Sequence, residues 1–162
     1  MIVKQNRFLV VLFLFMSLYS IAQQVGVYKT TDLLKRIYNK SDTLYIVNFW
    51  ATWCKPCVAE LPAFEKINSE SVLSTSKTKV KVLLVTMDFK EDLNKRVIPF
   101  LKTNHYLTEV VLLDETIGNE FINKITPEWT GAIPATIITQ NNKARFEFFE
   151  KKVTYEFLKE KR

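Results

Sequence analysis

The chain has 162 residues, a length that suggests a single domain able to bury a substantial core. Its apolar fraction of 48%, charged fraction of 25% and three glycines exclude a disordered or low-complexity protein. The net charge of +6 is spread along the chain, so we expect no nucleic-acid partner.

The first 22 residues have the layout of a secretory signal peptide. Lys4 and Arg7 precede an apolar run over residues 8–19, and the small residues Ser20 and Ala22 follow. We favour cleavage after Ala22, because residues 8–22 are short for a membrane-spanning helix. Retention of this segment as a membrane anchor is the alternative. The sequence therefore predicts a signal peptide or anchor over 1–22, an exported and periplasmic location, and one domain over 23–162.

Hydrophobic periodicity after residue 23 predicts helices that alternate with buried strands. Pro62 is expected to kink the helix that contains it, and Pro99 is expected to kink its helix or break it early. Alternating helices and strands indicate an α/β protein, whose central mixed β-sheet has a parallel core, an antiparallel edge and helices on both faces. In chain order, the expected helices cover 30–40, 54–69, 91–104, 116–125 and 154–161, and the expected strands cover 43–50, 80–88, 109–114, 135–139 and 144–150.

The only two cysteines, Cys54 and Cys57, lie just after a predicted buried strand. A structural zinc site needs about four Cys or His ligands, and the one histidine, His105, is distant and expected at the surface. Covalent haem attachment requires a histidine directly after the pair, where Val58 stands. A disulfide across two residues closes a very small loop and stabilises little. These arguments favour a redox pair with no metal or cofactor.

The two cysteines are expected to play different parts. Cys54 would open a helix, whose free N–H groups stabilise a thiolate and lower the thiol pKa. Cys57 lies one turn further along and should be more buried, so that Cys54 attacks a disulfide and Cys57 resolves the product. Pro56 suits the first helical turn. Lys55 either adds positive charge near Cys54 or is simply solvated.

Two stretches resemble the signatures of the thioredoxin superfamily. "VNFWATWCKPC", residues 47–57, is similar to its active-site motif, and "GAIPATII", residues 131–138, is similar to its proline loop. With "CVAELP" and the signal-like start, the chain resembles the exported TlpA/ResA-like branch and its thioredoxin-like fold. The resemblance implies a cis bond between Ile133 and Pro134, with the Ile133 backbone available to bind an extended substrate.

The resemblance also implies roles for side chains around the cysteines. Asn48 stands where thioredoxins carry a buried, titrating Asp, so the usual proton relay is absent. Glu60 matches an acid of ResA-like proteins. Burial is expected to raise the pKa of the Glu60 carboxyl, so that Glu60 can exchange a proton with Cys57. The alternative is that Glu60 lies at the surface and pairs with a lysine. Trp50 is expected beneath the site and Trp53 beside it, and Trp129 would either line the groove or anchor the loop.

These features predict an exported thiol–disulfide oxidoreductase, with Cys54, Cys57, Glu60 and Pro134 as catalytic residues. Contacts to substrate are expected from Trp53, Lys55, Pro56 and Ile133. Branch members act as reductants, for instance in cytochrome c maturation. The resemblance thus implies protein disulfide substrates, a membrane thiol donor and a monomer. Alternatives are a thiol peroxidase-related protein, although its proline-containing motif is missing, and a copper or haem-pathway chaperone that binds through both thiolates.

Overall fold

The computed structural model describes residues 24–39, 41–76, 78–115 and 118–162. The predicted signal peptide or anchor lies outside the described residues. None of the described helices has the length and apolar character needed to cross a membrane.

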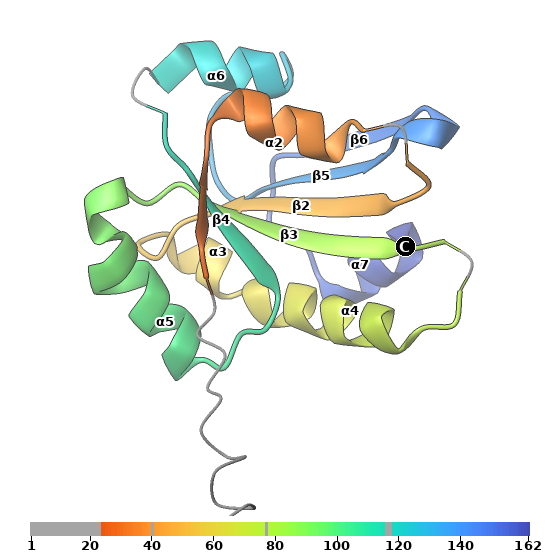
Figure 1. Cartoon of the computed structure of the whole chain (residues 1–162), viewed down its shortest axis with the longest axis horizontal. Coiled ribbons are helices and arrows are strands. Elements are labelled where there is room, and N and C mark those ends of the chain that lie inside the picture. Colours follow the sequence, from red (N-terminus) through yellow and green to blue (C-terminus); the bar gives the residue numbers. More distant parts are fainter. Residues whose placement is uncertain (1–23, 40, 77, 116–117) are drawn as a thin grey trace, which may run out of the picture.

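A single six-stranded sheet forms the centre of the molecule (Figure 1). Its first four strands pair in parallel, and the last two pair antiparallel, as the predicted mixed sheet requires. The short strand β1 (Gly26–Tyr28) was not predicted, because three residues are too few to show a period and the strand depends on pairing with β4 (Glu109–Leu113). In spatial order the strands are β1 (Gly26–Tyr28), β4 (Glu109–Leu113), β3 (Val80–Thr86), β2 (Leu44–Trp50), β5 (Ala135–Gln140) and β6 (Arg145–Phe149).

Helices cover both faces of the sheet (Figure 1). Helices α2 (Thr30–Ile37) and α6 (Gly118–Ile125) pack on one face, whose core includes Val47 and Phe49 of β2. The opposite face packs against α3 (Lys55–Val58), α4 (Leu61–Leu73), α5 (Ile98–Thr103) and α7 (Tyr155–Lys161).

Strand β2 is buried along its whole length, as a central strand should be. Successive side chains of a strand alternate between the two faces. Ile46 and Trp50 enter the core beneath α3 and α4, together with both cysteines. Asn48 lies between them in the alternation and is therefore directed to the same face, on the cysteine side of the sheet.

The helix expected over residues 54–69 is two helices. Helix α3 ends at Val58, and α4 begins at Leu61. Pro62 occupies the first turn of α4, where its missing N–H leaves no helical hydrogen bond unmade. The proline therefore produces a break rather than a kink, and Glu60 stands in that break as the N-cap residue of α4.

The helix expected over residues 91–104 is also irregular. A 3₁₀ turn (Lys90–Asp92) and a π turn (Leu93–Val97) precede α5. Pro99 again lies in the first turn of the regular helix. The proline cannot donate to the carbonyl four residues earlier, which accounts for the widened turn before it.

Candidate active site

Cys54 and Cys57 form a disulfide with an S–S distance of 2.01 Å. Strand β2 ends at Trp50, and the Cys54 N–H donates to the Ala51 carbonyl at 3.1 Å, which closes a tight turn into α3. Cys54 is the N-cap residue of α3, and its Sγ accepts from the Cys57 N–H at 3.4 Å. Helix α3 is only one turn long, and the Cys57 N–H is the backbone donor that lies against the Cys54 sulfur.

The two sulfurs differ in accessibility as expected from the sequence. Cys54 retains 6% of its surface, whereas Cys57 is fully buried. An incoming disulfide can therefore reach Cys54 only. Trp53, Lys55 and Pro56 are exposed around it, with Trp53 at 58%, and Trp50 is buried beneath the site.

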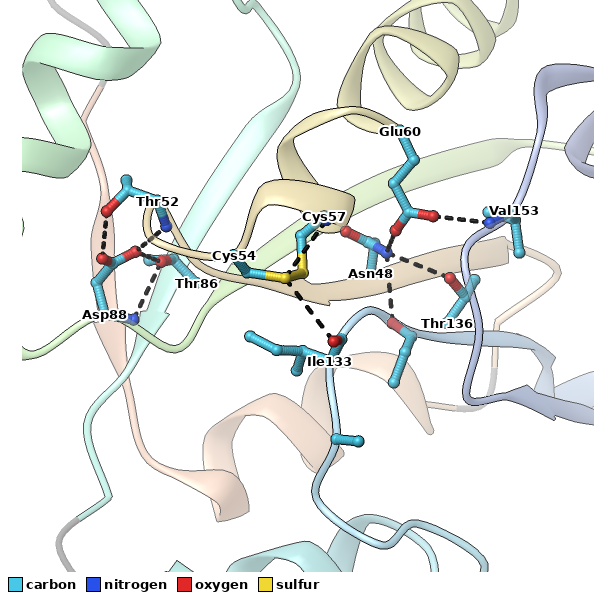
Figure 2. Close-up of a disulfide and its surroundings, with 12 residues drawn as sticks. Asn48, Thr52, Cys54, Cys57, Glu60, Thr86, Asp88, Ile133, Thr136 and Val153 are labelled. Atoms are coloured by element: carbon cyan, nitrogen blue, oxygen red, sulfur yellow. Dashed lines mark hydrogen bonds between the residues drawn. A yellow bond between two sulfur atoms is a disulfide. The ribbon is translucent and has the colours of Figure 1, made fainter.

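The proline loop lies opposite Cys54. The peptide bond between Ile133 and Pro134 is cis, as predicted. The Ile133 carbonyl oxygen is 3.8 Å from the Cys54 Sγ (Figure 2). Two segments separated by 79 residues in sequence thus meet at the accessible sulfur.

Glu60 is buried behind the cysteines, with only 2% of its surface exposed. This agrees with the expected buried Glu60, and the alternative of a surface Glu paired with a lysine is wrong. Its Oε1 accepts from Asn48 Nδ2 at 2.8 Å, and its Oε2 accepts from the Val153 N–H at 2.7 Å. Burial raises the pKa of the Glu60 carboxyl, and the two hydrogen bonds and the charge of Lys152 oppose this rise in part.

Asn48 lies between Glu60 and the disulfide in Figure 2. It is fully buried, and its Nδ2 also approaches Ala135 O at 3.4 Å and Thr136 Oγ1 at 3.3 Å. Its Oδ1 is buried without a hydrogen-bond partner among the described residues. The sequence indicated that position 48 carries an amide where thioredoxins carry an acid, and that Glu60 supplies an acid instead. The structure places the side chains of Asn48 and Glu60 in direct contact.

An aspartate that the sequence did not single out holds the turn before Cys54. Asp88 follows β3 and is buried, with 2% exposure. Its carboxylate accepts from the Thr52 N–H at 2.9 Å and from the hydroxyls of Thr52 and Thr86, each at 2.5 Å (Figure 2). An acid at the carboxyl end of a buried strand, beside the strand that leads to the cysteines, was the available signal.

Trp129 and His105 belong outside the reacting centre. The Trp129 ring is buried and lies 4.6 Å from the Phe49 ring, so it anchors the loop rather than lining the groove. His105 is exposed at the end of α5. The described residues contain no group of three or more His, Cys, Asp or Glu side chains that could hold a metal ion.

Comparison with known proteins agrees with this arrangement. Residues 25–102 match the family model described as Thioredoxin. This stretch of the chain is therefore similar to thioredoxin. The matched stretch includes both cysteines and Glu60; the proline loop lies beyond it.

Two curated relatives match part of the chain. Thioredoxin-like protein YneN of Bacillus subtilis is 40% identical over 70 residues, which cover 43% of this chain and 38% of YneN. A thioredoxin of Rickettsia bellii is 41% identical over 49 residues, which cover 30% of this chain and 42% of that protein. The chain thus spans about two fifths of the length of these relatives.

Solved structures share the fold over more of the chain. StoA from Bacillus subtilis has a TM-score of 0.54 at 24% identity, and the alignment covers 76% of this chain and 84% of StoA. A secreted thiol-disulfide isomerase from Corynebacterium glutamicum has a TM-score of 0.59 at 20% identity, with 74% and 68% covered. These similarities establish the thioredoxin-like fold of the domain.

Proposed function

We propose that this protein is a thiol–disulfide oxidoreductase that reduces disulfides of protein substrates. The observation that carries the proposal is the Cys54–Cys57 disulfide, which has one accessible and one buried sulfur and faces the Ile133 carbonyl across the proline loop. An accessible attacking sulfur and a shielded resolving sulfur are what disulfide exchange through a mixed intermediate requires.

In the reduced protein, the Cys54 thiolate attacks one sulfur of a substrate disulfide. A bond forms between Cys54 and that sulfur, and the other substrate sulfur leaves as a thiolate. Cys57 then loses its proton and attacks the Cys54 sulfur, which closes the intramolecular disulfide and releases the second substrate thiolate. The substrate gains two electrons and leaves as two thiolates, the Cys54–Cys57 pair loses those two electrons, and the single proton released comes from Cys57.

Glu60 is the proton acceptor for Cys57 in this scheme. Cys57 is fully buried, so its proton needs a nearby base rather than bulk water. A raised pKa brings the Glu60 carboxyl closer to the pH at which it can both take and return a proton. Asn48 donates a hydrogen bond to the Glu60 carboxylate and cannot itself titrate.

The two residues between the cysteines help to set the redox potential of the pair. Pro56 occupies the position at which oxidising members of the superfamily often carry histidine. We propose a potential on the reducing side of about −200 mV. Titration of the Cys54–Cys57 pair in glutathione buffers tests this, and a value near −120 mV would contradict it.

The cellular setting is proposed from the N-terminal sequence and the resemblance to the TlpA/ResA-like branch. Residues 1–22 support export to the periplasm, either as a cleaved signal or as an anchor. Two of the solved relatives, from Corynebacterium glutamicum and Mycobacterium tuberculosis, are described as secreted. A reductant in that compartment needs a membrane thiol donor to recharge it, and the substrates include proteins of cytochrome c maturation.

A trapping experiment tests the proposed function. The Cys57→Ser variant should accumulate mixed disulfides on Cys54, because the resolving thiol is missing. Cys54→Ser is the matched control and should trap nothing, and the wild-type protein should reduce insulin. An empty trap together with no insulin reduction would contradict the proposal. Consumption of peroxide, or tight copper binding without insulin reduction, would favour the peroxidase or the chaperone instead.

A further inference from the structure

The loop before Pro134 is held by two side chains that the scheme above does not use. The Trp129 indole Nε1–H donates to the Ala132 carbonyl at 2.8 Å. Between these residues, Gly131 has a φ of +95°, a conformation that side-chain-bearing residues rarely adopt. The indole, itself fixed in the aromatic core beside Phe49, therefore ties a tight turn to the rigid part of the domain.

Glu150 holds the same loop from the other side. It follows directly after β6, and its Oε1 accepts from the Thr130 hydroxyl at 2.5 Å and from the Ala132 N–H at 2.9 Å. Its Oε2 accepts from the Thr130 N–H at 3.4 Å. No ion pair to Glu150 is found in the described part of the chain, so all of its polar contacts found there are to this loop. Carboxylate-to-amide hydrogen bonds of this kind are stronger than neutral ones.

The two contacts together use both backbone polar groups of Ala132. Its N–H is bound by Glu150, and its carbonyl is bound by Trp129. The next residue, Ile133, is the one whose carbonyl lies 3.8 Å from the Cys54 Sγ. With Ala132 fixed at both groups, the plane of the following peptide and hence the direction of the Ile133 backbone are set before any substrate arrives.

The chain that follows β6 also reaches the other side of the site. Three residues after Glu150, the Val153 N–H donates to Glu60 at 2.7 Å. One short connector thus contacts both the substrate-facing loop and the proton acceptor behind Cys57. This gives the connector a fixed position that does not depend on the half-buried side chain of Glu150 alone.

We propose that Glu150 and Trp129 are positioning residues that hold the Ile133 backbone in the conformation that receives an extended protein segment. The inference rests on the proposed function and deepens it, because it assigns the preference for polypeptide over small disulfides to this clamp. A protein substrate adds backbone hydrogen bonds at Ile133, whereas a small disulfide needs only access to Cys54. Ordering the loop in advance removes an entropic cost that only the protein substrate would otherwise bear.

The test compares Glu150→Gln with the matched control Glu147→Gln. Glu147 lies on β6, and its carboxylate binds Arg145 and Lys161 rather than the loop. In Glu150→Gln, the side-chain amide has one oxygen fewer to accept the loop donors, so KM for insulin should rise about five- to tenfold. The effect on reduction of glutathione disulfide should be at least about threefold smaller, and Glu147→Gln should show no such split.

A second variant and a second measurement keep the inference separate from the proposed function. Trp129→Phe removes the indole N–H and keeps an aromatic ring, and it should give the same KM split. In Glu150→Gln, hydrogen exchange at the Ala132 amide should speed up at least about tenfold, whether or not the protein is active. Equal effects on both disulfides, or unchanged exchange and unchanged KM, would overturn the clamp. Faster exchange in a protein that reduces neither disulfide would instead count against the proposed function.

Discussion

Replacing Asn48 with Asp should make folding stability strongly dependent on pH. Asn48 is fully buried and donates to Glu60 Oε1 at 2.8 Å, so Asn48→Asp places a second carboxyl against the first. Two charges about 3 Å apart repel by about 5–6 kcal/mol at an effective dielectric constant of about 20. Keeping one proton at pH 7 on a carboxyl of ordinary pKa, near 4, costs about 4 kcal/mol. Protonating one carboxyl costs less than the repulsion between two charged ones, so the pair should share one proton.

The sign of the pH effect follows from this shared proton. The folded variant holds the proton at a pKa above that of the unfolded chain, so it binds more protons than the unfolded chain between about pH 4.5 and 7. Its stability should therefore fall as pH rises through that range. Relative to wild type, we expect a loss of about 3–4 kcal/mol at pH 7 and of less than about 1 kcal/mol at pH 4.5.

Urea unfolding of the oxidised protein at several pH values measures the effect, because the disulfide removes both thiols from the titration. Asn142→Asp is the matched control. The Asn142 amide also donates to a carboxylate, Asp42 Oδ1 at 2.7 Å, but it lies at an exposed position. Solvent screening should limit its cost to about 1 kcal/mol or less. Equal losses in the two variants, or a loss in Asn48→Asp that does not change with pH, would refute the reasoning.

Three further substitutions test other parts of the structure. Gly131→Ala should lower the free energy of unfolding, measured in urea melts, by about 1–2 kcal/mol. The reason is that φ at Gly131 is +95° and the new Cβ would lie 2.8 Å from Ile122 Cδ1. An unchanged melt would contradict the left-handed turn. Glu109 pairs with Arg36, which lowers its pKa to about 2, so the stability from this pair is present above about pH 4.5 and is lost as pH falls toward 2. Glu109→Gln should therefore cost about 1 kcal/mol at pH 7, since the pair is partly exposed, and almost nothing near pH 2, as acid titrations of both proteins would show. Asp88→Asn should destabilise the fold by about 1–3 kcal/mol, because the carboxylate accepts hydrogen bonds from Thr52 and Thr86, and an unaltered urea melt would mean that the turn does not depend on this carboxylate.

Local sequence patterns predicted most elements of this fold. The apolar run of β2 indicated a strand buried on both faces, and that strand is central in the sheet. The C-x-x-C motif after it indicated a helix N-terminus, where Cys54 is found. These features can be predicted from the sequence because they depend on residues within a few positions of one another. The break between α3 and α4 was harder to predict, because Pro62 permits either a kink or a new helix start. Packing decides between these two outcomes.

The functional side chains show even more clearly which features the local sequence determines and which depend on tertiary packing. The sequence by itself determined which residues could react: a cysteine pair after a buried strand, an acid at Glu60 and an amide at Asn48 where an acid is usual. Only the tertiary structure decided that Asn48 and Glu60 touch, that Asp88 fixes the turn before Cys54, and that Glu150 binds the loop before Pro134. The physical reason is that each of these contacts joins segments brought together by sheet pairing and burial, and a buried polar group takes whichever partner the packed chain places within hydrogen-bonding distance.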